Sequence, residues 1–368
     1  MDHWFEIKND DRILSPALLF YPDRIQANIQ KMLRMAGSAD RLRPHVKTYK
    51  CKEIVSMQME AGITKFKCAT LAEAQMLAEC NVSDILVAYP LVRANQQKFL
   101  NLRKAYPAIS FSTLIDHPEQ VRQWKQHQEA PVNIFVDLDV GMHRTGISVN
   151  TLEELLSSID AEYFNLMGFH AYDGHIRDGD SAERKEHVQQ SFREVKHFLD
   201  DFEGPQTFIA GGSITFPVHA TYPSRVLSPG TPLLWDRGYG ESFPDLQFDI
   251  AVTLLARIIS KPGPNLLCLD LGYKAIASEM KEHPPVAFPQ IPDAEITDHS
   301  EEHLVIKTGD AKKWNIGGVL YGFPWHICPT VALHAKAGIV EDRSVQASWE
   351  IASRDRHYFF NEYETQNE

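Results

Sequence analysis

The feature that most constrains this chain is a regular alternation of short apolar runs with amphipathic stretches between residues 17 and 213. The stretches carry apolar residues at helical spacing, as Ile25, Ile29, Met32 and Leu33 do. Strands that alternate with helices of this length are typical of parallel βαβ units. Eight runs are predicted to be strands: Ala17–Phe20, Arg43–Lys47, Phe66–Ala69, Ile85–Ala88, Ile109–Thr113, Val132–Asp137, Asn165–His170 and Thr207–Ala210.

Eight such units predict an α/β fold, a (β/α)8 TIM-type barrel. An open doubly wound sheet is the alternative, and it is disfavoured because no GxGxxG motif follows the first strand. Thr70 followed by Glu73 predicts a capping box at the start of a helix. After the first amphipathic stretch, helices are expected over residues 51–61, 71–79, 94–104, 117–128, 150–158 and 181–200.

The pattern changes near residue 240, where Phe248, Ile250, Val252 and Leu254 alternate with other residues as in a half-buried strand. Gly and Pro then separate further short strands. We therefore predict a barrel over residues 16–240 and a mostly-β C-terminal domain over 241–368, joined by residues 1–15. The further strands are predicted over Leu266–Leu271, His303–Lys307 and Val319–Gly322.

The amino-acid composition limits the classes of binding partner and the cellular compartment that we expect for this chain. The chain has 37 basic and 49 acidic residues, a net charge of −12, which disfavours binding to nucleic acid or to an anionic membrane. Its five cysteines form no CxxC pair, so a reducing compartment fits better than a disulfide framework. The N-terminal sequence shows no secretory signal, and no apolar run is long enough to span a bilayer. We expect a cytoplasmic protein.

Several polar residues follow predicted strands, at the end of the barrel where chemistry usually lies. Lys47 ends the second strand, Arg144 follows the sixth, and Tyr172 and His175 follow the seventh. A small-residue turn, 211–213, follows the eighth and could leave backbone amides for an anion. Each feature alone has a simpler explanation, such as a surface charge or a plain turn. Together they suit a phosphorylated aldehyde cofactor.

The segment 324-PWHICPT suggests a metal pair. On an extended segment His326 and Cys328 point to the same side. An imidazole and a thiolate can share a borderline-soft ion such as Zn²⁺, with positions left for water or substrate. A buried cysteine beside a partly exposed histidine is the alternative, because zinc sites normally have three or four protein ligands.

With these motifs the chain resembles the fold-type III pyridoxal phosphate enzymes. Within them it is similar to the group of D-threonine aldolases and eukaryotic-type D-serine dehydratases. The barrel of this group is like the N-terminal domain of alanine racemase. The resemblance runs in family order across nearly the whole chain. The pieces that carry it are 43-RPHVKT, 137-DLDVGMHRTG, 168-GFHAYDGH, 211-GGS, 227-LSPGT, 269-LDLGYKA, 300-SEEH and 324-PWHICPTV.

The resemblance implies a homodimer that binds pyridoxal 5'-phosphate and a divalent metal, zinc first, with manganese or magnesium as alternatives. In its terms, Lys47 matches the Schiff-base lysine and Arg144 the arginine near the phenolic oxygen of the cofactor. Tyr172 matches a tyrosine beside the pyridine ring. The phosphate loop is matched by Gly211, Gly212 and Ser213, and the metal pair by His326 and Cys328.

The resemblance leaves two reactions open. Cys328 matches the dehydratases, whereas the aldolases carry Asp there and share the following Pro-Thr-Val. Ser213 stands where the family's phosphate turn often has Gly or Thr, and Ile176-Arg177 stands where many aldolases have a glutamine-histidine step. The implied function is a lyase for D-3-hydroxy amino acids, a D-serine dehydratase-like enzyme ahead of a D-threonine aldolase. Lys47 would be the base at Cα, and in the aldolase His175 would act on the hydroxyl. An amino-acid racemase and a non-enzymatic pyridoxal phosphate-binding protein are further alternatives.

Overall fold

The computed structural model describes residues 3–126 and 130–356, which divide into two compact units. One unit takes residues 32–47 and 55–230, and the other takes residues 3–31, 48–54 and 231–354. The predicted domain limits, 16–240 and 241–368 with 1–15, remain a prediction. The end of the predicted helix 117–128 lies outside the described residues, as do residues 1–2 and 357–368. Within the described ranges, no helix has the length and apolar character needed to cross a membrane.

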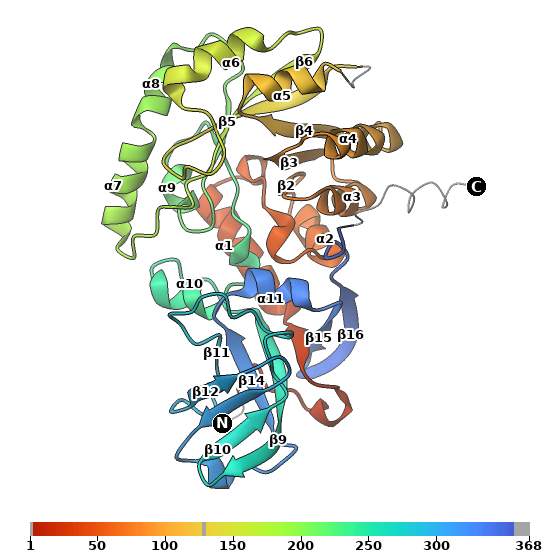
Figure 1. Cartoon of the computed structure of the whole chain (residues 1–368), viewed down its shortest axis with the longest axis vertical. Coiled ribbons are helices and arrows are strands. Elements are labelled where there is room, and N and C mark those ends of the chain that lie inside the picture. The colour runs from red at the N-terminus through yellow and green to blue at the C-terminus, as the bar shows by residue number, and fades with distance from the viewer. Residues whose placement is uncertain (1–2, 127–129, 357–368) are drawn as a thin grey trace, which may run out of the picture. The chain divides into compact units, whose positions relative to one another are not determined.

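Seven parallel strands form the sheet of the first unit, in the order β2-β3-β4-β5-β6-β7-β8. Figure 1 shows helices α3 to α8 on the outer side of these strands. The strands are β2 (Lys65–Cys68), β3 (Asp84–Pro90), β4 (Ser110–Ile115), β5 (Val132–Leu138), β6 (Phe164–Ala171), β7 (Thr207–Ala210) and β8 (Arg225–Leu227). The helices are α3 (Leu71–Glu79), α4 (Ala94–Ala105), α5 (Pro118–Trp124), α6 (Leu152–Ser158), α7 (Ser181–Ser191), α8 (Arg193–Asp201) and α9 (Phe216–Ala220).

Residues 42–45 join the two edges of this sheet. Leu42 forms a parallel bridge with Leu227 of β8, and His45 forms one with Lys67 of β2. The amide of Arg43 donates to the carbonyl of Leu227 over 2.8 Å. The segment therefore takes the place of an eighth strand and closes the sheet. The predicted α/β barrel is confirmed.

The prediction that Ala17–Phe20 is a barrel strand is wrong. This segment is β1 and pairs with β9 (Val252–Gly263) and β15 (Lys336–Glu341) in the other unit. The missing barrel strand is β8, which the sequence analysis overlooked because it has only three residues. A short apolar run has the same appearance in a barrel and in a neighbouring buried sheet, so the pattern alone cannot assign it.

Two helix predictions have different outcomes. The capping box is confirmed, since the hydroxyl of Thr70 accepts from the amide of Glu73 over 3.1 Å, and the Glu73 carboxylate accepts from the amide of Ala69 over 2.7 Å. The predicted helix 181–200 is two helices, α7 and α8, that meet at Phe192. The backbone of Phe192 has φ −97° and ψ 7°, outside the helical region, which interrupts the regular turns.

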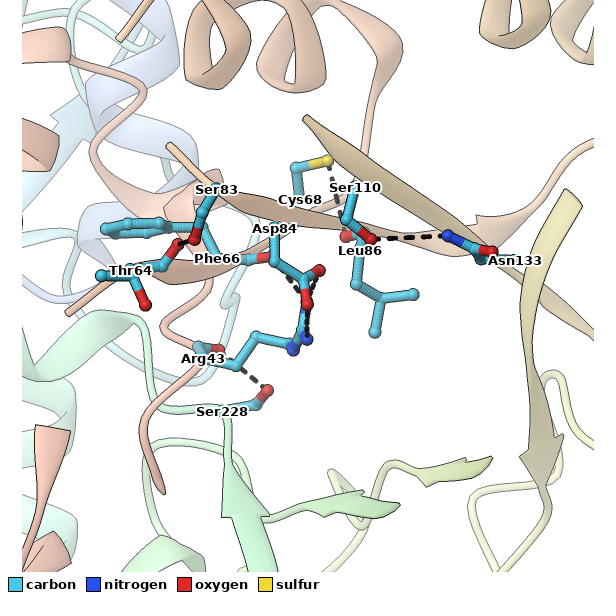
Figure 2. A network of polar contacts seen from close by, with 10 residues as sticks. All are labelled: Arg43, Thr64, Phe66, Cys68, Ser83, Asp84, Leu86, Ser110, Asn133 and Ser228. Atoms are coloured by element: carbon cyan, nitrogen blue, oxygen red, sulfur yellow. Dashed lines mark hydrogen bonds and ion pairs between the residues drawn. The ribbon is translucent and has the colours of Figure 1, made fainter. Parts of the chain in front are cut away.

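Arg43 anchors the closing segment inside the barrel, as Figure 2 shows. Its two terminal nitrogens each lie 2.8 Å from an oxygen of Asp84 on β3. The Ser228 hydroxyl, just after β8, donates to the carbonyl of Arg43 over 3.0 Å. The forked guanidinium matches a carboxylate, and here it is almost fully buried. The pair therefore ties the closing segment to strands on both sides of it.

Apolar side chains fill the barrel beyond this ion pair. Leu86 lies two residues after Asp84 on β3, and it packs with Leu114, Phe135 and Ile209 from three other strands. All four are nearly inaccessible to solvent. The interior is thus a packed core and not a channel. Polar groups near the carboxyl ends of the strands therefore lie above a layer of apolar side chains.

The second unit is mostly β, as the sequence predicted for its C-terminal part, and its strands pair antiparallel except for β1 and β15, which are parallel. Its sheet has the order β12-β13-β10-β9-β1-β15-β16, and β14 pairs with β9 and β11. Its other elements are β1 (Ala17–Phe20), β10 (Leu266–Leu269), β11 (Val286–Ala287), β12 (Glu295–His299), β13 (Leu304–Lys307), β14 (Val319–Pro324), β16 (Ser344–Glu350), α10 (Arg237–Ser242) and α11 (Ile327–Leu333). The chain passes from one unit to the other at several points. One of them lies within helix α1 (Pro22–Ala36) and another within helix α2 (Lys52–Glu60).

Breaking the Arg43–Asp84 pair tests its role in closing the barrel. Asp84→Ala leaves the guanidinium buried without its carboxylate, so we expect the free energy of unfolding to fall by about 3 kcal/mol in urea unfolding followed by circular dichroism. The control Asp200→Ala breaks a pair with Lys196 in which both side chains are 57% exposed, and it should cost less than about 1 kcal/mol. Equal losses in the two variants would contradict this role.

Candidate active site

Lys47, Arg144 and Tyr172 come together at the carboxyl end of the barrel. Lys47 follows the closing segment, Arg144 lies in the loop after β5, and Tyr172 directly follows β6. The Lys47 amino nitrogen lies 5.8 Å from the centroid of the Tyr172 ring, and the guanidinium carbon of Arg144 lies 5.2 Å from it. Two cations around one aromatic ring make this an electropositive site with a flat apolar surface.

The turn 211–213 lies beside the same tyrosine. Gly211 has φ +84°, and a Cβ there would lie 2.9 Å from the Cα of Phe216, so the turn requires glycine. A Cβ on Gly212 would lie 3.1 Å from Cε2 of Tyr172. Ser213 completes the turn before α9. A Cβ on Gly211 would also meet His219, whereas only the one on Gly212 would meet Tyr172, so the turn passes close to Tyr172 at Gly212.

A buried charged network supports this turn, and the sequence analysis missed it. Arg225 donates to Nδ1 of His219 over 2.6 Å, so His219 carries its proton on Nε2 and donates to Asp173 over 2.8 Å. The Thr215 hydroxyl also donates to Asp173 over 2.8 Å. Burial acts to raise the pKa of Asp173, but its interaction with His219 and the bond from Thr215 keep the pKa below its usual value.

His175, the base expected for an aldolase, lies near His187. Among the described residues, no hydrogen bond or ring contact joins it to Lys47 or Tyr172. Its ring centroid lies 5.6 Å from that of His187, and its buried Nδ1 has no hydrogen-bond partner in the part of the chain that the structure describes. Burial and then the charge of His187 lower the pKa of His175, which favours the neutral imidazole that a base requires.

His326 and Cys328 lie in the second unit, where β14 leads into α11. The prediction that both stand on an extended segment is wrong for Cys328. His326 has extended dihedral angles, φ −130° and ψ 105°, and caps the helix, whereas Cys328 lies in its first turn. The two side chains nevertheless influence each other, since Cys328 raises the pKa of His326 and His326 lowers that of Cys328.

The surroundings of this pair favour a thiolate. The sulfur of Cys328 lies 3.2 Å from the Thr48 hydroxyl and 3.5 Å from that of Thr231, and Nδ1 of His326 donates to Glu279. Burial acts to raise the pKa of Cys328, but His326 and the two hydroxyls lower it. Burial acts to lower the pKa of His326, but Cys328 and Glu279 raise it to about 9. A thiolate beside an imidazole that a carboxylate orients has the chemistry of a metal-ligand pair.

Among the described residues, His326 and Cys328 are not part of a larger cluster of ligand side chains. In residues 3–126 and 130–356, no group of three or more His, Cys, Asp or Glu side chains is arranged to hold a metal ion. Two protein ligands suit a catalytic metal, which keeps coordination positions for water or substrate, better than a structural one.

The charge on Asp173 provides a test of the network behind the turn. Because its pKa lies below the usual 3.8, the carboxylate stabilises the fold above about pH 4, and this contribution is lost as the pH falls through the lowered pKa. We expect Asp173→Asn to lose about 3 kcal/mol of unfolding free energy near neutral pH. The difference from the wild type should shrink in unfolding experiments below about pH 4. A difference that does not vary with pH would count against this network.

Comparison with known proteins matches both parts of the chain to families. Residues 21–235 match the family described as alanine racemase, N-terminal domain, and residues 251–340 match the "Putative serine dehydratase domain". A D-threonine aldolase of Arthrobacter sp. is 28% identical over 363 residues, 93% of each chain. A D-serine dehydratase of Schizosaccharomyces pombe is 24% identical over 88% of each chain. A D-threo-3-hydroxyaspartate dehydratase of Delftia sp. is 23% identical over 91% of this chain and 96% of its own.

Solved structures share the fold. A D-threonine aldolase from Filomicrobium marinum superposes with a TM-score of 0.84 and 22% identity, over 96% of this chain and 99% of its own. The Delftia dehydratase superposes with a TM-score of 0.75 and 22% identity, over 92% and 97%. Structures of that dehydratase include a variant with a histidine changed to alanine, and a metal-free variant with a cysteine two positions later changed to alanine. The chain belongs to the alanine racemase N-terminal domain family, within the fold-type III enzymes that its motifs resemble.

Proposed function

We propose that the protein is a pyridoxal phosphate- and metal-dependent lyase that converts D-3-hydroxy amino acids, D-serine above all, to a 2-oxo acid and ammonia. The observation that carries the choice of dehydration is Cys328, whose half-buried sulfur contacts the hydroxyls of Thr48 and Thr231 and whose pKa His326 lowers. A histidine and a cysteine with the same spacing are each changed to alanine in the dehydratase variants described above. The cysteine variant is the metal-free one. A homodimer and a cytoplasmic location belong to the same proposal.

The barrel residues fit the cofactor. The turn 211–213 would hold the phosphate; it passes close to Tyr172 at Gly212, whose amide lies 3.5 Å from an oxygen of Asp173. Lys47 would bind the aldehyde carbon, and Arg144 would face an oxygen on the ring. Bound pyridoxal phosphate supplies an electron sink for the negative charge that develops at Cα. The Tyr172 ring, between the two cations, offers a flat surface on which an aromatic ring can stack.

The chain's own residues then have distinct roles. The amine of Lys47 takes the Cα proton as general base. Thr48, the next residue in the chain, and Thr231 place their hydroxyls at the sulfur of Cys328 and stabilise its charge. His326 and Cys328 would hold a divalent metal, zinc first, with manganese or magnesium as alternatives. Such a metal supplies Lewis acidity to a hydroxyl that is otherwise a poor leaving group.

D-threonine aldolase activity is the second candidate. It is favoured by the 28% identity to the Arthrobacter aldolase over 93% of the chain. Here His175, with its lowered pKa, would remove the proton of the substrate hydroxyl, and the Cα–Cβ bond would break to give glycine and an aldehyde. A racemase would differ from both in being insensitive to chelators, and a non-enzymatic binding protein would turn over no D-amino acid.

Product analysis separates these reactions. D-Serine, D-threonine and D-threo-3-hydroxyaspartate are each incubated with the holoenzyme, with and without chelator. Ammonia with a 2-oxo acid, lost on chelation, is the expected result. If glycine and an aldehyde form instead, the enzyme is an aldolase and the dehydratase proposal is wrong. If the substrate is racemised and neither set of products forms, both proposed reactions are overturned.

Lys47→Ala tests the cofactor site. We expect the yellow colour to disappear and turnover to fall by at least about 10³-fold, because the amine that binds the aldehyde is gone. Borohydride reduction of the wild type followed by peptide mass spectrometry should find the cofactor on Lys47. The control Lys65→Ala, on β2, should stay yellow and active. Reduction that labels a different lysine would refute the assignment.

Cys328→Ala tests the metal pair. Without its thiolate the site keeps one protein ligand, so we expect bound zinc to fall from about one per chain to near zero. Dehydratase activity should fall with it, while the yellow colour persists. The control Cys268→Ala alters a cysteine on β10 and should retain both metal and activity. Full zinc content in Cys328→Ala, measured by atomic absorption, would exclude this cysteine as a ligand.

A further inference from the structure

Residues 277–285, which we call the strap, lie just before β11 and have no regular secondary structure. Both ends of the strap are tied to the segment that carries the metal pair. The amide of Ala277 donates to the hydroxyl of Thr330 over 3.2 Å, and the amide of Trp325 donates to the carbonyl of Pro285 over 2.8 Å. All the residues between Ala277 and Pro285 are exposed. The strap is therefore a surface segment that is fixed at its two ends.

Two side chains of the exposed part turn back onto consecutive residues of the site. The Glu279 carboxylate accepts a hydrogen bond from Nδ1 of His326. The ring of His283 stacks on that of Trp325, with 4.0 Å between the ring centroids and 13° between the planes. Ordering long exposed side chains costs rotamer entropy, which such contacts must offset. The strap thus holds on to Trp325 and reaches the neighbouring His326.

Trp325 is itself a fixed support, because the start of α10 packs against it. The amide of Gly238 donates to the carbonyl of Trp325 over 3.0 Å, and a Cβ on Gly238 would lie 2.5 Å from that oxygen. The guanidinium carbon of Arg237 lies 5.5 Å from the centroid of the Trp325 ring. Only glycine permits so close an approach. His283 therefore stacks on a ring that α10 already holds in place.

The contact of Glu279 is that of an orienting carboxylate. A carboxylate only accepts, so the proton of His326 lies on Nδ1 and the lone pair of Nε2 is left for a metal. The backbone of His326 is fixed as well, since its carbonyl accepts from the Thr330 hydroxyl over 2.8 Å. Within the described ranges, Glu279, His326 and Cys328 are not arranged as three ligands of one ion. Glu279 can therefore act on the metal through the imidazole.

We propose that Glu279 is a positioning residue for the metal, which keeps the proton of His326 on Nδ1 and leaves Nε2 to bind the ion. In the same proposal, the stack of His283 on Trp325 keeps Glu279 within reach of His326. The inference rests on the role proposed for His326 as a metal ligand, but not on which reaction follows. A carboxylate that orients a ligating histidine changes metal affinity by roughly 10- to 100-fold.

The first test measures zinc affinity in the metal-stripped holoenzyme by competition with a chromogenic chelator. We expect Glu279→Ala to bind zinc roughly 10- to 100-fold more weakly. Glu279→Gln, which keeps an acceptor for the Nδ1 proton without the charge, should recover part of this loss. The control Glu282→Ala removes another exposed glutamate of the strap and should bind zinc as the wild type does. Wild-type affinity in Glu279→Ala, or equal losses in the alanine and glutamine variants, would overturn the inference.

The second test concerns the stack. His283→Ala should weaken zinc binding by less than Glu279→Ala does. The double variant should bind zinc as Glu279→Ala does, because both changes act through one contact with His326. Losses that simply add would show that the stack does not act through Glu279.

The third test locates the proton directly. In zinc-loaded protein with ¹⁵N-labelled histidine, the His326 signals are assigned by their absence from His326→Gln. NMR should find the proton on Nδ1 and the metal on Nε2, and a metal on Nδ1 would overturn the inference.

The outcomes separate this inference from the proposed reaction. If zinc affinity and the NMR signals follow these expectations while the holoenzyme converts no D-3-hydroxy amino acid, the positioning role stands and the lyase proposal fails. If turnover depends on zinc but Glu279→Ala binds zinc as the wild type does, the lyase proposal stands and the role of Glu279 is refuted.

Discussion

The bridge that residues 42–45 form between β8 and β2 is the constraint on which the rest of the barrel site depends. His45 pairs with Lys67 of β2, and Lys47 follows two residues later. The closure therefore sets the positions of both lysines at once, while Arg43 anchors the same segment to Asp84. A barrel without this bridge would have an unpaired edge where the reactive amine should stand.

Two buried polar networks leave the carboxyl end of β6 in different directions. His170 connects Asp137 with Lys67 inside the barrel, and Asp173 connects with His219 and Arg225 behind the turn 211–213. Between them stands Tyr172. In each network the carboxylate accepts hydrogen bonds from at least two donors, which limits the cost of burying its charge. One strand end therefore orders the aromatic surface, the anion turn and the amine of Lys67 together.

Most of the barrel strands, and the polar residues that follow them, could be predicted from the sequence, because the alternation of strands with helices and the short motifs are local signals. The sequence analysis misplaced Ala17–Phe20, since an apolar run does not reveal which sheet it joins, and it overlooked Lys67, which lies within a run predicted as an apolar strand. The link between Asp173 and Arg225 left no signal, because residues so far apart in the chain meet only in the folded barrel. Cys328 was expected on a strand because nothing before it signals a helix start.

The surroundings of Cys328 also bear on which metal the site would select. A thiolate beside two hydroxyls is a soft donor, and the neighbouring imidazole is a borderline one. Magnesium prefers oxygen ligands and keeps its water, whereas zinc binds thiolate and imidazole readily. Because the carboxylate of Glu279 is engaged with Nδ1 of His326, it serves to orient the imidazole rather than to supply a hard oxygen ligand. The donor set therefore favours zinc over magnesium, and a thiolate ligand distinguishes this site from one in which an aspartate would stand at position 328.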